Sequence, residues 1–170
     1  GLMRFGWQGK YEGDVLVGLS RAGEAGGGSV TLEPGGQLEL SGAPLTNIHQ
    51  TCAEVNRHLG EVRTVAAELG QSYLGIGYAP SWGLEDAPQM PKGRYRLMTD
   101  YMPTRGTRGL EMMYLTATVQ VNLDFGSPAD MVEKLKIALA LQPLATALFA
   151  NSPFKNGKPT GNLSERSLVW

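Results

Sequence analysis

The sequence predicts an α+β fold in which helices flank a mainly antiparallel sheet. Strand-like segments on either side of Glu33–Gln37 are joined by a turn that contains Pro-Gly-Gly. Two long stretches, 45–69 and 127–149, instead carry the apolar spacing or the start signals of helices. The order is strands, helix, strand, loop, strand and helix, which favours the α+β class.

Length and composition favour a globular chain that forms one domain, residues 1–170. Hydrophobic residues make up 42% of the chain and charged residues 18%, which excludes a disordered protein. The net charge of −1 gives no support for a nucleic-acid partner or an anionic membrane surface. The longest apolar run, Ile137–Leu141, is too short to span a bilayer.

The first part of the chain predicts a meander of strands. Asp14–Leu19 is apolar enough for a strand, and Gly23–Gly28 is expected to form a flexible loop at a hairpin tip. Val30–Leu32 and Leu38–Leu40 are the next expected strands. Glu33–Gln37 joins them, and its proline suits a turn because it cannot donate a ladder hydrogen bond.

A long amphipathic helix is predicted over Leu45–Leu69. Its apolar residues recur at spacings of three and four, and Gly70 supplies a stop. Tyr73–Tyr78 is expected to form a buried strand whose glycines allow close packing. Residues 80–91 are expected to be loop.

The middle of the chain predicts a short helix, a loop and a strand. Lys92–Tyr101 is the expected helix and Pro103–Gly109 the polar loop. Thr116–Phe125 alternates polar and apolar residues over its length, which predicts a strand with one polar face.

A second long helix is predicted to start at Ser127, which is a favourable cap followed by Pro128 at the first position. It should run to about Phe149, with a kink at Pro143. Residues 151–161 are expected to be loop.

Two carboxylates mark the hairpin as a candidate site. Glu33 and Glu39 lie among apolar neighbours on adjacent strand segments. An unpaired charge on a half-buried strand is unfavourable, so a metal ion, an ammonium group or an arginine is expected nearby. Mg²⁺ suits carboxylate oxygens together with phosphate. Alternatively the hairpin lies at the surface and its acids are solvated, which spacing alone favours.

Other polar residues allow both functional and plain structural interpretations. The polar face of Thr118, Gln120, Asn122 and Asp124 fits a solvated sheet face or the lining of a cleft. Arg94 and Arg166 suit carboxylate or phosphate, or a surface ion pair. Asn151 begins a segment that fits a ligand loop or a connection. His49 and His58 are too far apart for a metal pair, and solvated or capping roles are expected for both.

Several long strings carry a resemblance to a known family. They include Ser29–Gly42 (SVTLEPGGQLELSG), 90–95 (MPKGRY), 118–125 (TVQVNLDF) and 138–154 (ALALQPLATALFANSPF). Together they resemble the plant and proteobacterial type of glutamate–cysteine ligase, over nearly the whole chain.

This resemblance implies a fold, a reaction and roles for individual residues. The sheet would be curved, glutamine-synthetase-like and incomplete in this chain. ATP and Mg²⁺ would be the cofactors, and γ-glutamyl phosphate the intermediate that the cysteine amino group attacks. Glu33 and Glu39 would hold metal, and Arg94 and Arg166 would be catalytic through anion binding. The implied substrate-binding residues are Thr118, Gln120, Asn122 and Asn151.

The resemblance also implies a larger protein of which this chain is an internal segment. The small-molecule partners would be glutamate, cysteine and ATP, with a homodimer or a completing chain as a further partner. The location would be cytoplasmic for a bacterial-like protein, or the plastid for a plant protein. Two alternatives remain open: a ligase of the same fold with another amine acceptor, and a binding module without turnover.

Overall fold

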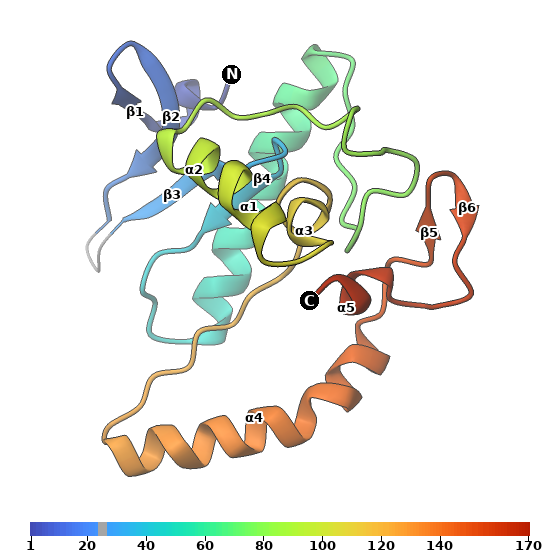
Figure 1. Ribbon diagram of the computed structural model, residues 1–170. Helices are drawn as coiled ribbons and strands as arrows, with labels where there is room; N and C mark the ends of the chain where they lie inside the picture. Colours follow the sequence, from blue (N-terminus) through green and yellow to red (C-terminus); the bar gives the residue numbers. More distant parts are fainter. Residues whose placement is uncertain (24–26) are drawn as a thin grey trace. The chain divides into compact units, whose positions relative to one another are not determined.

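The computed structural model describes residues 1–23 and 27–170. The chain divides into two compact units: unit 1 comprises residues 1–74 and 87–106, and unit 2 comprises residues 75–86 and 107–170 (Figure 1). Residues 24–26 of the loop expected at Gly23–Gly28 lie outside the described residues. The expectation of a single domain stays a prediction.

Unit 1 contains an antiparallel sheet of four strands in the order β1-β2-β3-β4. The strands are β1 (Gln8–Glu12), β2 (Val15–Arg21), β3 (Gly28–Leu32) and β4 (Leu38–Ser41). The last three confirm the predicted meander. β1 was not predicted, because its sequence, QGKYE, has no alternating apolar pattern. The α+β class is confirmed, while the glutamine-synthetase-like curvature stays a prediction.

Helices and a small apolar cluster complete unit 1. Trp7, Leu19 and Val30 are buried together. Helix α1 (Ile48–Glu68) begins after Asn47, whose side chain accepts a hydrogen bond from the Gln50 amide. The stop predicted at Gly70 is confirmed, since this residue has φ 64°. The remaining helices are η1 (Leu2–Phe5), α2 (Gly93–Tyr101) and η2 (Met102–Thr104).

A buried polar group joins α1 to the sheet. Glu61 accepts hydrogen bonds from Trp7 Nε1 at 2.7 Å and Arg21 Nη2 at 2.8 Å. His58 packs edge-on against Trp7 and is only 7% exposed. The expectation that His58 is solvated or a cap is therefore wrong, because the ring belongs to the packed side of α1.

Unit 2 contains three helices and a short hairpin. The helices are α3 (Gly109–Leu115), α4 (Pro128–Leu148) and α5 (Glu165–Val169). The hairpin consists of β5 (Phe154–Lys155) and β6 (Lys158–Pro159). The cap predicted for α4 is confirmed, since Ser127 Oγ accepts a hydrogen bond from the Asp130 amide at 3.2 Å. Figure 1 shows α4 changing direction in its C-terminal half, where Pro143 lies.

Two predicted strands are wrong. Within Tyr73–Tyr78 and Thr116–Phe125, the described pairing is one isolated bridge between Tyr78 and Thr116. Tyr73 is 54% exposed and Val119 is 92% exposed. The alternating pattern of Thr116–Phe125 suits a strand, but a strand also needs a partner, and among the described residues this segment has only that single bridge.

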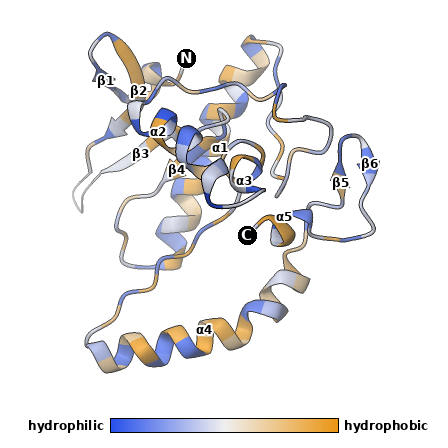
Figure 2. Cartoon of the chain, viewed as in Figure 1, coloured by the Kyte–Doolittle hydropathy of each residue, from blue (hydrophilic) through white to orange (hydrophobic). Residues whose placement is uncertain are grey.

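Helix α4 is also exposed on every side. No residue of this helix is buried, and Figure 2 shows apolar residues along much of its length. Leu135, Ile137, Leu139 and Leu144 are each more than half exposed, so the apolar residues of this helix are uncovered among the described residues. No helix among the described residues is long and apolar enough to cross a membrane.

Candidate functional site

The turn between β3 and β4 places the two predicted metal ligands. Glu33 N donates to Gln37 O at 2.8 Å, and Gly36 N donates to Glu33 O at 2.7 Å. Gly36 has φ +79°, a conformation that favours glycine. The turn also contacts the loop that precedes α2, since Met90 N donates to Pro34 O at 3.0 Å.

Glu33 and Glu39 lie on the same face of the hairpin. Glu39 pairs directly with Thr31, and paired residues share a face. Thr31 Oγ1 lies 3.5 Å from Glu33 Oε1, on that same side. Both carboxylates are half-buried, so they are not the fully solvated acids that spacing favoured. Neither forms an ion pair with any residue that the structure describes.

Helix α2 adds an arginine beside Glu33 through a buried tyrosine. Tyr95 is 3% exposed, and its hydroxyl lies 3.3 Å from Glu33 Oε1. Arg94 Nη2 donates to the same hydroxyl at 3.2 Å. This hydrogen bond raises the pKa of Arg94, and the charge of Glu33 adds to the effect. The structure therefore brings Glu33 and Arg94 to one place, with Tyr95 between them.

A lysine from the same segment completes this group. Lys92 Nζ donates to Tyr95 OH at 3.1 Å and to Leu32 O at 3.0 Å. Sequence reasoning missed both Lys92 and Tyr95, although they flank Arg94 in MPKGRY. Two carboxylates on one face, with cations beside them, can bind a divalent cation and an anion together.

The donor set at the hairpin fits part of a magnesium site. The part of the chain that the structure describes has no group of three or more His, Cys, Asp and Glu side chains that could hold a metal. Mg²⁺ is nevertheless commonly held by one or two carboxylates, with phosphate and water oxygens completing its shell. Glu33 and Glu39 can supply that share.

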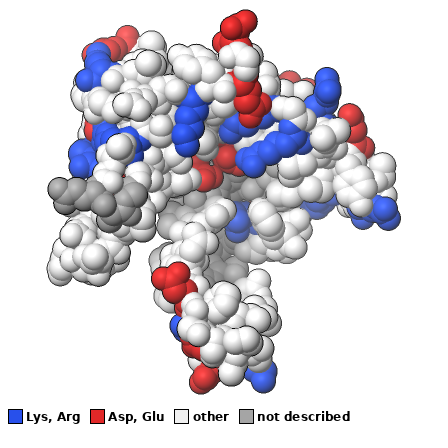
Figure 3. Space-filling model, turned by 90° about the vertical axis from the view of Figure 1, so that its left-hand side faces the viewer, with Lys and Arg blue, Asp and Glu red and all other residues white. Residues whose placement is uncertain are grey.

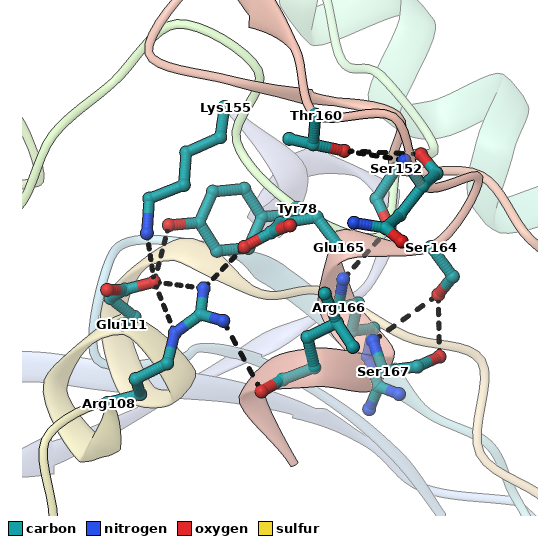
Figure 4. Close-up of polar contacts among 12 residues, drawn as sticks. Tyr78, Arg108, Glu111, Ser152, Lys155, Thr160, Ser164, Glu165, Arg166 and Ser167 are labelled. Carbon is teal, nitrogen blue, oxygen red and sulfur yellow. Dashed lines mark hydrogen bonds and ion pairs between the residues drawn. The ribbon is translucent and has the colours of Figure 1, made fainter.

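Arg166 lies in unit 2, at the start of α5. Its backbone N–H donates to Ser152 Oγ at 3.1 Å (Figure 4). Its Nε atom is buried and has no hydrogen-bond partner among the described residues. Burial lowers the pKa of Arg166, with no carboxylate opposing the shift. The alternative of a surface ion pair is therefore not realised, and the guanidinium is available to an anion.

An ion network that sequence reasoning missed lies beside α5. Glu111 Oε2 accepts from Arg108 Nη2 at 2.6 Å, Lys155 Nζ at 2.9 Å and Tyr78 OH at 2.9 Å. Arg108 Nη2 also donates to Glu165 Oε1 at 2.5 Å. Arg108 and Glu111 are three residues apart, but Tyr78, Lys155 and Glu165 come from other segments of the sequence, so no local motif pointed to the network.

The network sets the protonation of its central acid. Burial alone would raise the pKa of Glu111, but hydrogen bonds from Arg108, Lys155 and Tyr78 outweigh burial and hold that pKa at about 2. Burial also raises the pKa of Tyr78, so its hydroxyl stays a donor to Glu111. Glu111 is thus ionised at neutral pH and accepts from Arg108, Lys155 and Tyr78 together.

The predicted substrate-binding residues are less well organised. Asn151 Nδ2 donates to Gly75 O at 2.7 Å, and Asn151 O accepts from Gly77 N at 3.0 Å, so this residue holds the 75–77 segment. Thr118, Gln120 and Asn122 are exposed in the segment that was expected to be a strand. The structure does not supply the sheet on which these three were expected to lie.

Charges elsewhere are mixed in sign. On the face shown in Figure 3, lysine and arginine side chains lie close to aspartate and glutamate side chains. This agrees with the net charge of −1.

Comparison with known proteins gives a consistent result. Residues 9–170 match the family model of glutamate–cysteine ligase family 2. The chain is 60% identical over 167 residues to a chloroplastic glutamate–cysteine ligase of Nicotiana tabacum, and equally to one of Arabidopsis thaliana. It is 58% identical to glutamate–cysteine ligase A, chloroplastic, of Oryza sativa subsp. japonica.

These matches cover 98% of the chain but only 31–33% of each relative. The chain therefore spans about a third of the length of the curated relatives it matches. The names of these relatives say chloroplastic, which agrees with the location expected if the source is a plant. The cytoplasmic location expected for a bacterial-like protein stays a prediction.

Proposed function

The chain belongs to glutamate–cysteine ligase family 2, and from this membership we propose that it is the segment of a ligase that carries part of the active site. The complete enzyme would join the γ-carboxylate of glutamate to the amino group of cysteine, as the first step of glutathione synthesis. The observation that carries the proposal is the Glu33–Tyr95–Arg94 contact within a chain that matches this family from residue 9 to residue 170.

The reaction proposed requires charge to be neutralised at two steps. The γ-carboxylate of glutamate attacks the γ-phosphorus of ATP, and the bond from that phosphorus to ADP breaks. The cysteine nitrogen then attacks the γ-carbonyl carbon of glutamyl phosphate, releases inorganic phosphate and loses a proton. Phosphoryl transfer depends mostly on positioning and on stabilising the developing charge.

The hairpin of unit 1 supplies groups suited to this task. Glu33 and Glu39 would hold Mg²⁺, which supplies positive charge to the phosphate oxygens when it is bound. Arg94 would bind an anionic group beside them. The Tyr95 hydroxyl links the two sites, since it lies 3.2 Å from Arg94 Nη2 and 3.3 Å from Glu33 Oε1. A bidentate guanidinium suits either phosphate or carboxylate.

In unit 2, Arg166 would be the second catalytic arginine. The buried, unpartnered Nε atom supports an anion-binding role. Thr118, Gln120, Asn122 and Asn151 stay proposed substrate-binding residues. A complete sheet would place Thr118, Gln120 and Asn122 on one face.

The sheet of the complete protein would contain a strand that is unpaired in this chain. We propose that residues 118–125 form a strand of a curved, glutamine-synthetase-like sheet when further polypeptide pairs with them. Val119, Val121 and Leu123 are 92%, 77% and 65% exposed, which supports a missing partner. That partner would be the rest of the same polypeptide or a second copy. For a plant source, the proposed location is the plastid.

The test is a turnover assay on the complete polypeptide, with ATP, Mg²⁺, glutamate and cysteine, following ADP release and the γ-glutamyl product. Arg94→Ala and Arg166→Ala should each lower kcat/KM by at least about a hundredfold, as expected when a charge-stabilising donor is lost. Arg105→Ala is the matched control, because this arginine of unit 1 is exposed and contacts Tyr101.

Two results would contradict the proposal: no turnover by the unmodified protein, or undiminished turnover after both arginines are replaced. Other amines offered in place of cysteine would show whether the acceptor is the one proposed. Turnover with another amine and not with cysteine would show that the protein catalyses the same type of ligation with a different amine acceptor.

A further inference from the structure

We propose that Ser152 and Glu165 are positioning residues that set the direction of the Arg166 guanidinium. This inference rests on the anion-binding role proposed above for Arg166. It explains what orients the Arg166 side chain. It also assigns a role in the reaction to the ion network of unit 2.

Helix α5 cannot hold Arg166 in place by itself. It spans only Glu165–Val169, and helices this short are not stable in isolation. Its own cap, Ser164 Oγ accepting from Ser167 N at 3.3 Å, secures only the first turn. The orientation of the helix must therefore come from contacts with other segments.

Ser152 provides three of these contacts. Its N–H donates to Leu163 O at 3.0 Å, its carbonyl accepts from Glu165 N at 2.8 Å, and its hydroxyl accepts from Arg166 N at 3.1 Å. The residue is 3% exposed, so water does not compete for these bonds. Of the three, only the hydroxyl contact can be removed by a side-chain substitution.

Gly77 leaves the space in which Ser152 and Arg166 meet. A Cβ atom at this position would lie 3.3 Å from Ser152 Oγ and 3.5 Å from Arg166 Cδ. The contact with Ser152 Oγ would be tight and that with Arg166 Cδ ordinary, so Gly77 packs closely against both residues. The Arg166 stem leads to the guanidinium, whose Cζ atom lies 5.1 Å from the centre of the Trp170 ring.

Glu165 fixes the helix through its side chain. It is 5% exposed, and its Oε1 atom accepts from Arg108 Nη2 at 2.5 Å. Arg108 is held in turn by Glu111, which also binds Lys155 and Tyr78 (Figure 4). The contacts thus run from Tyr78 to the residue immediately before Arg166.

Arg166 has no ion pair in the described structure. Its neighbour Glu165 pairs with Arg108 instead, and adjacent residues on a helix do not face each other. The network therefore holds the helix that carries Arg166, while the guanidinium stays open to an anionic ligand.

A double-mutant cycle in the complete polypeptide tests this inference. Ser152→Ala should lower kcat/KM for glutamate about tenfold to a hundredfold when Arg166 is present, since a small misplacement of a catalytic group has effects of this order. In the Arg166→Ala background, Ser152→Ala should have no further effect. The dissociation constant for glutamate is measured in the same four proteins, so that slow variants also give a value.

Thr160→Val is the matched control. The Thr160 hydroxyl donates to Pro153 O at 3.1 Å in the neighbouring segment, and among the described residues its hydrogen-bond partners are Pro153 and Asn162. This variant should leave kcat/KM unchanged. A merely structural role for Ser152 would instead lower activity by the same factor in both Arg166 backgrounds, and that result would overturn the inference.

Glu165→Gln is the second variant, and it tests the positioning role if Ser152→Ala does not fold. It keeps the shape of the side chain and weakens the bond to Arg108. The kcat/KM for glutamate should therefore fall, again only when Arg166 is present. If the unmodified protein makes no γ-glutamyl product, the proposed function fails. If it does so and the cycles are additive, only the positioning role fails.

Discussion

Two segments with similar alternating patterns have different structures in the two units. In unit 1, β3 pairs with β4 in regular antiparallel register across the turn 33–37. In unit 2, residues 118–125 alternate as regularly, yet Val119 is 92% exposed. A hairpin strand finds its partner next in the sequence, whereas the next element after 118–125 is helix α4. Alternation thus indicates the capacity to form a strand, and the partner decides whether it forms.

Both units contain buried apolar residues, and they differ in how their buried charges are arranged. In unit 1, Glu61 pairs with Arg21 and accepts a hydrogen bond from Trp7, which belongs to the apolar cluster with Leu19 and Val30. In unit 2, Tyr78, Met113, Tyr114 and Leu115 are buried, and the ion network around Glu111 connects the β5–β6 hairpin and α5 to α3. We therefore expect unit 2 to lose stability when a charge of this network is removed, and unit 1 to lose stability when its apolar cluster is trimmed.

The largest effect is expected from Arg108→Met in unit 2. It leaves Glu165, which is 5% exposed, without its cation, and breaking a buried pair from one side costs about 3–5 kcal/mol. The free energy of unfolding is measured by urea denaturation of the complete protein. Arg4→Met is the control in unit 1, since its pair with Glu68 is exposed and should contribute nothing measurable. Equal losses in the two variants would contradict the contrast.

The next effect compares the two alternating segments directly. Val30→Ala should destabilise the protein by about 1.5–3 kcal/mol, because Val30 is 3% exposed in the core of unit 1. Val121→Ala should change stability by less than about 0.5 kcal/mol in residues 1–170 alone, because Val121 is 77% exposed there. In the complete polypeptide, Val121→Ala should become destabilising. Equal behaviour of Val121→Ala in both proteins would argue against a missing strand partner.

A smaller effect is expected at the turn that makes the hairpin. Gly36→Ala should be destabilising by about 1–2 kcal/mol, because Gly36 has φ +79° and an L-residue is disfavoured there. An added Cβ would also lie 3.1 Å from Pro88 Cγ. Gly126→Ala, beside the unpaired segment, meets no atom within 4 Å and should be close to neutral. A neutral Gly36→Ala would show that the turn does not depend on this conformation.

What the sequence could predict follows the same distinction between local and distant information. The β3–β4 turn, the helix stop at Gly70 and the cap at Ser127 depend on neighbours within a few residues, and all three are confirmed. The strand at 118–125 depends on a distant partner, so its local pattern was not enough.

The candidate site shows this limit as well. Family resemblance pointed to Glu33 and Arg94, but the role of Tyr95 between them depends on α2 lying beside β3. The contact from Arg108 to Glu165 joins residues that are 57 positions apart. Neither spacing nor periodicity carries that information, because ion pairs of this kind are decided by the tertiary fold.

Acidification from pH 7 to pH 5 should change the free energy of unfolding less than any of the destabilising substitutions above. Below pH 5, acidification should distinguish stabilisation by charge from stabilisation by apolar contacts. The pKa of Glu111 is about 2 in the folded protein, below its ordinary value of 4.5. A lowered pKa gives stability that is present above pH 4.5 and is lost as the pH falls towards 2. Unfolding followed by denaturant across this range should therefore show a decline that Glu111→Gln reduces. Val30→Ala should lower the free energy of unfolding at every pH without changing how steeply it falls with acid. If Glu111→Gln leaves that pH dependence unchanged, groups other than Glu111 cause the loss of stability in acid.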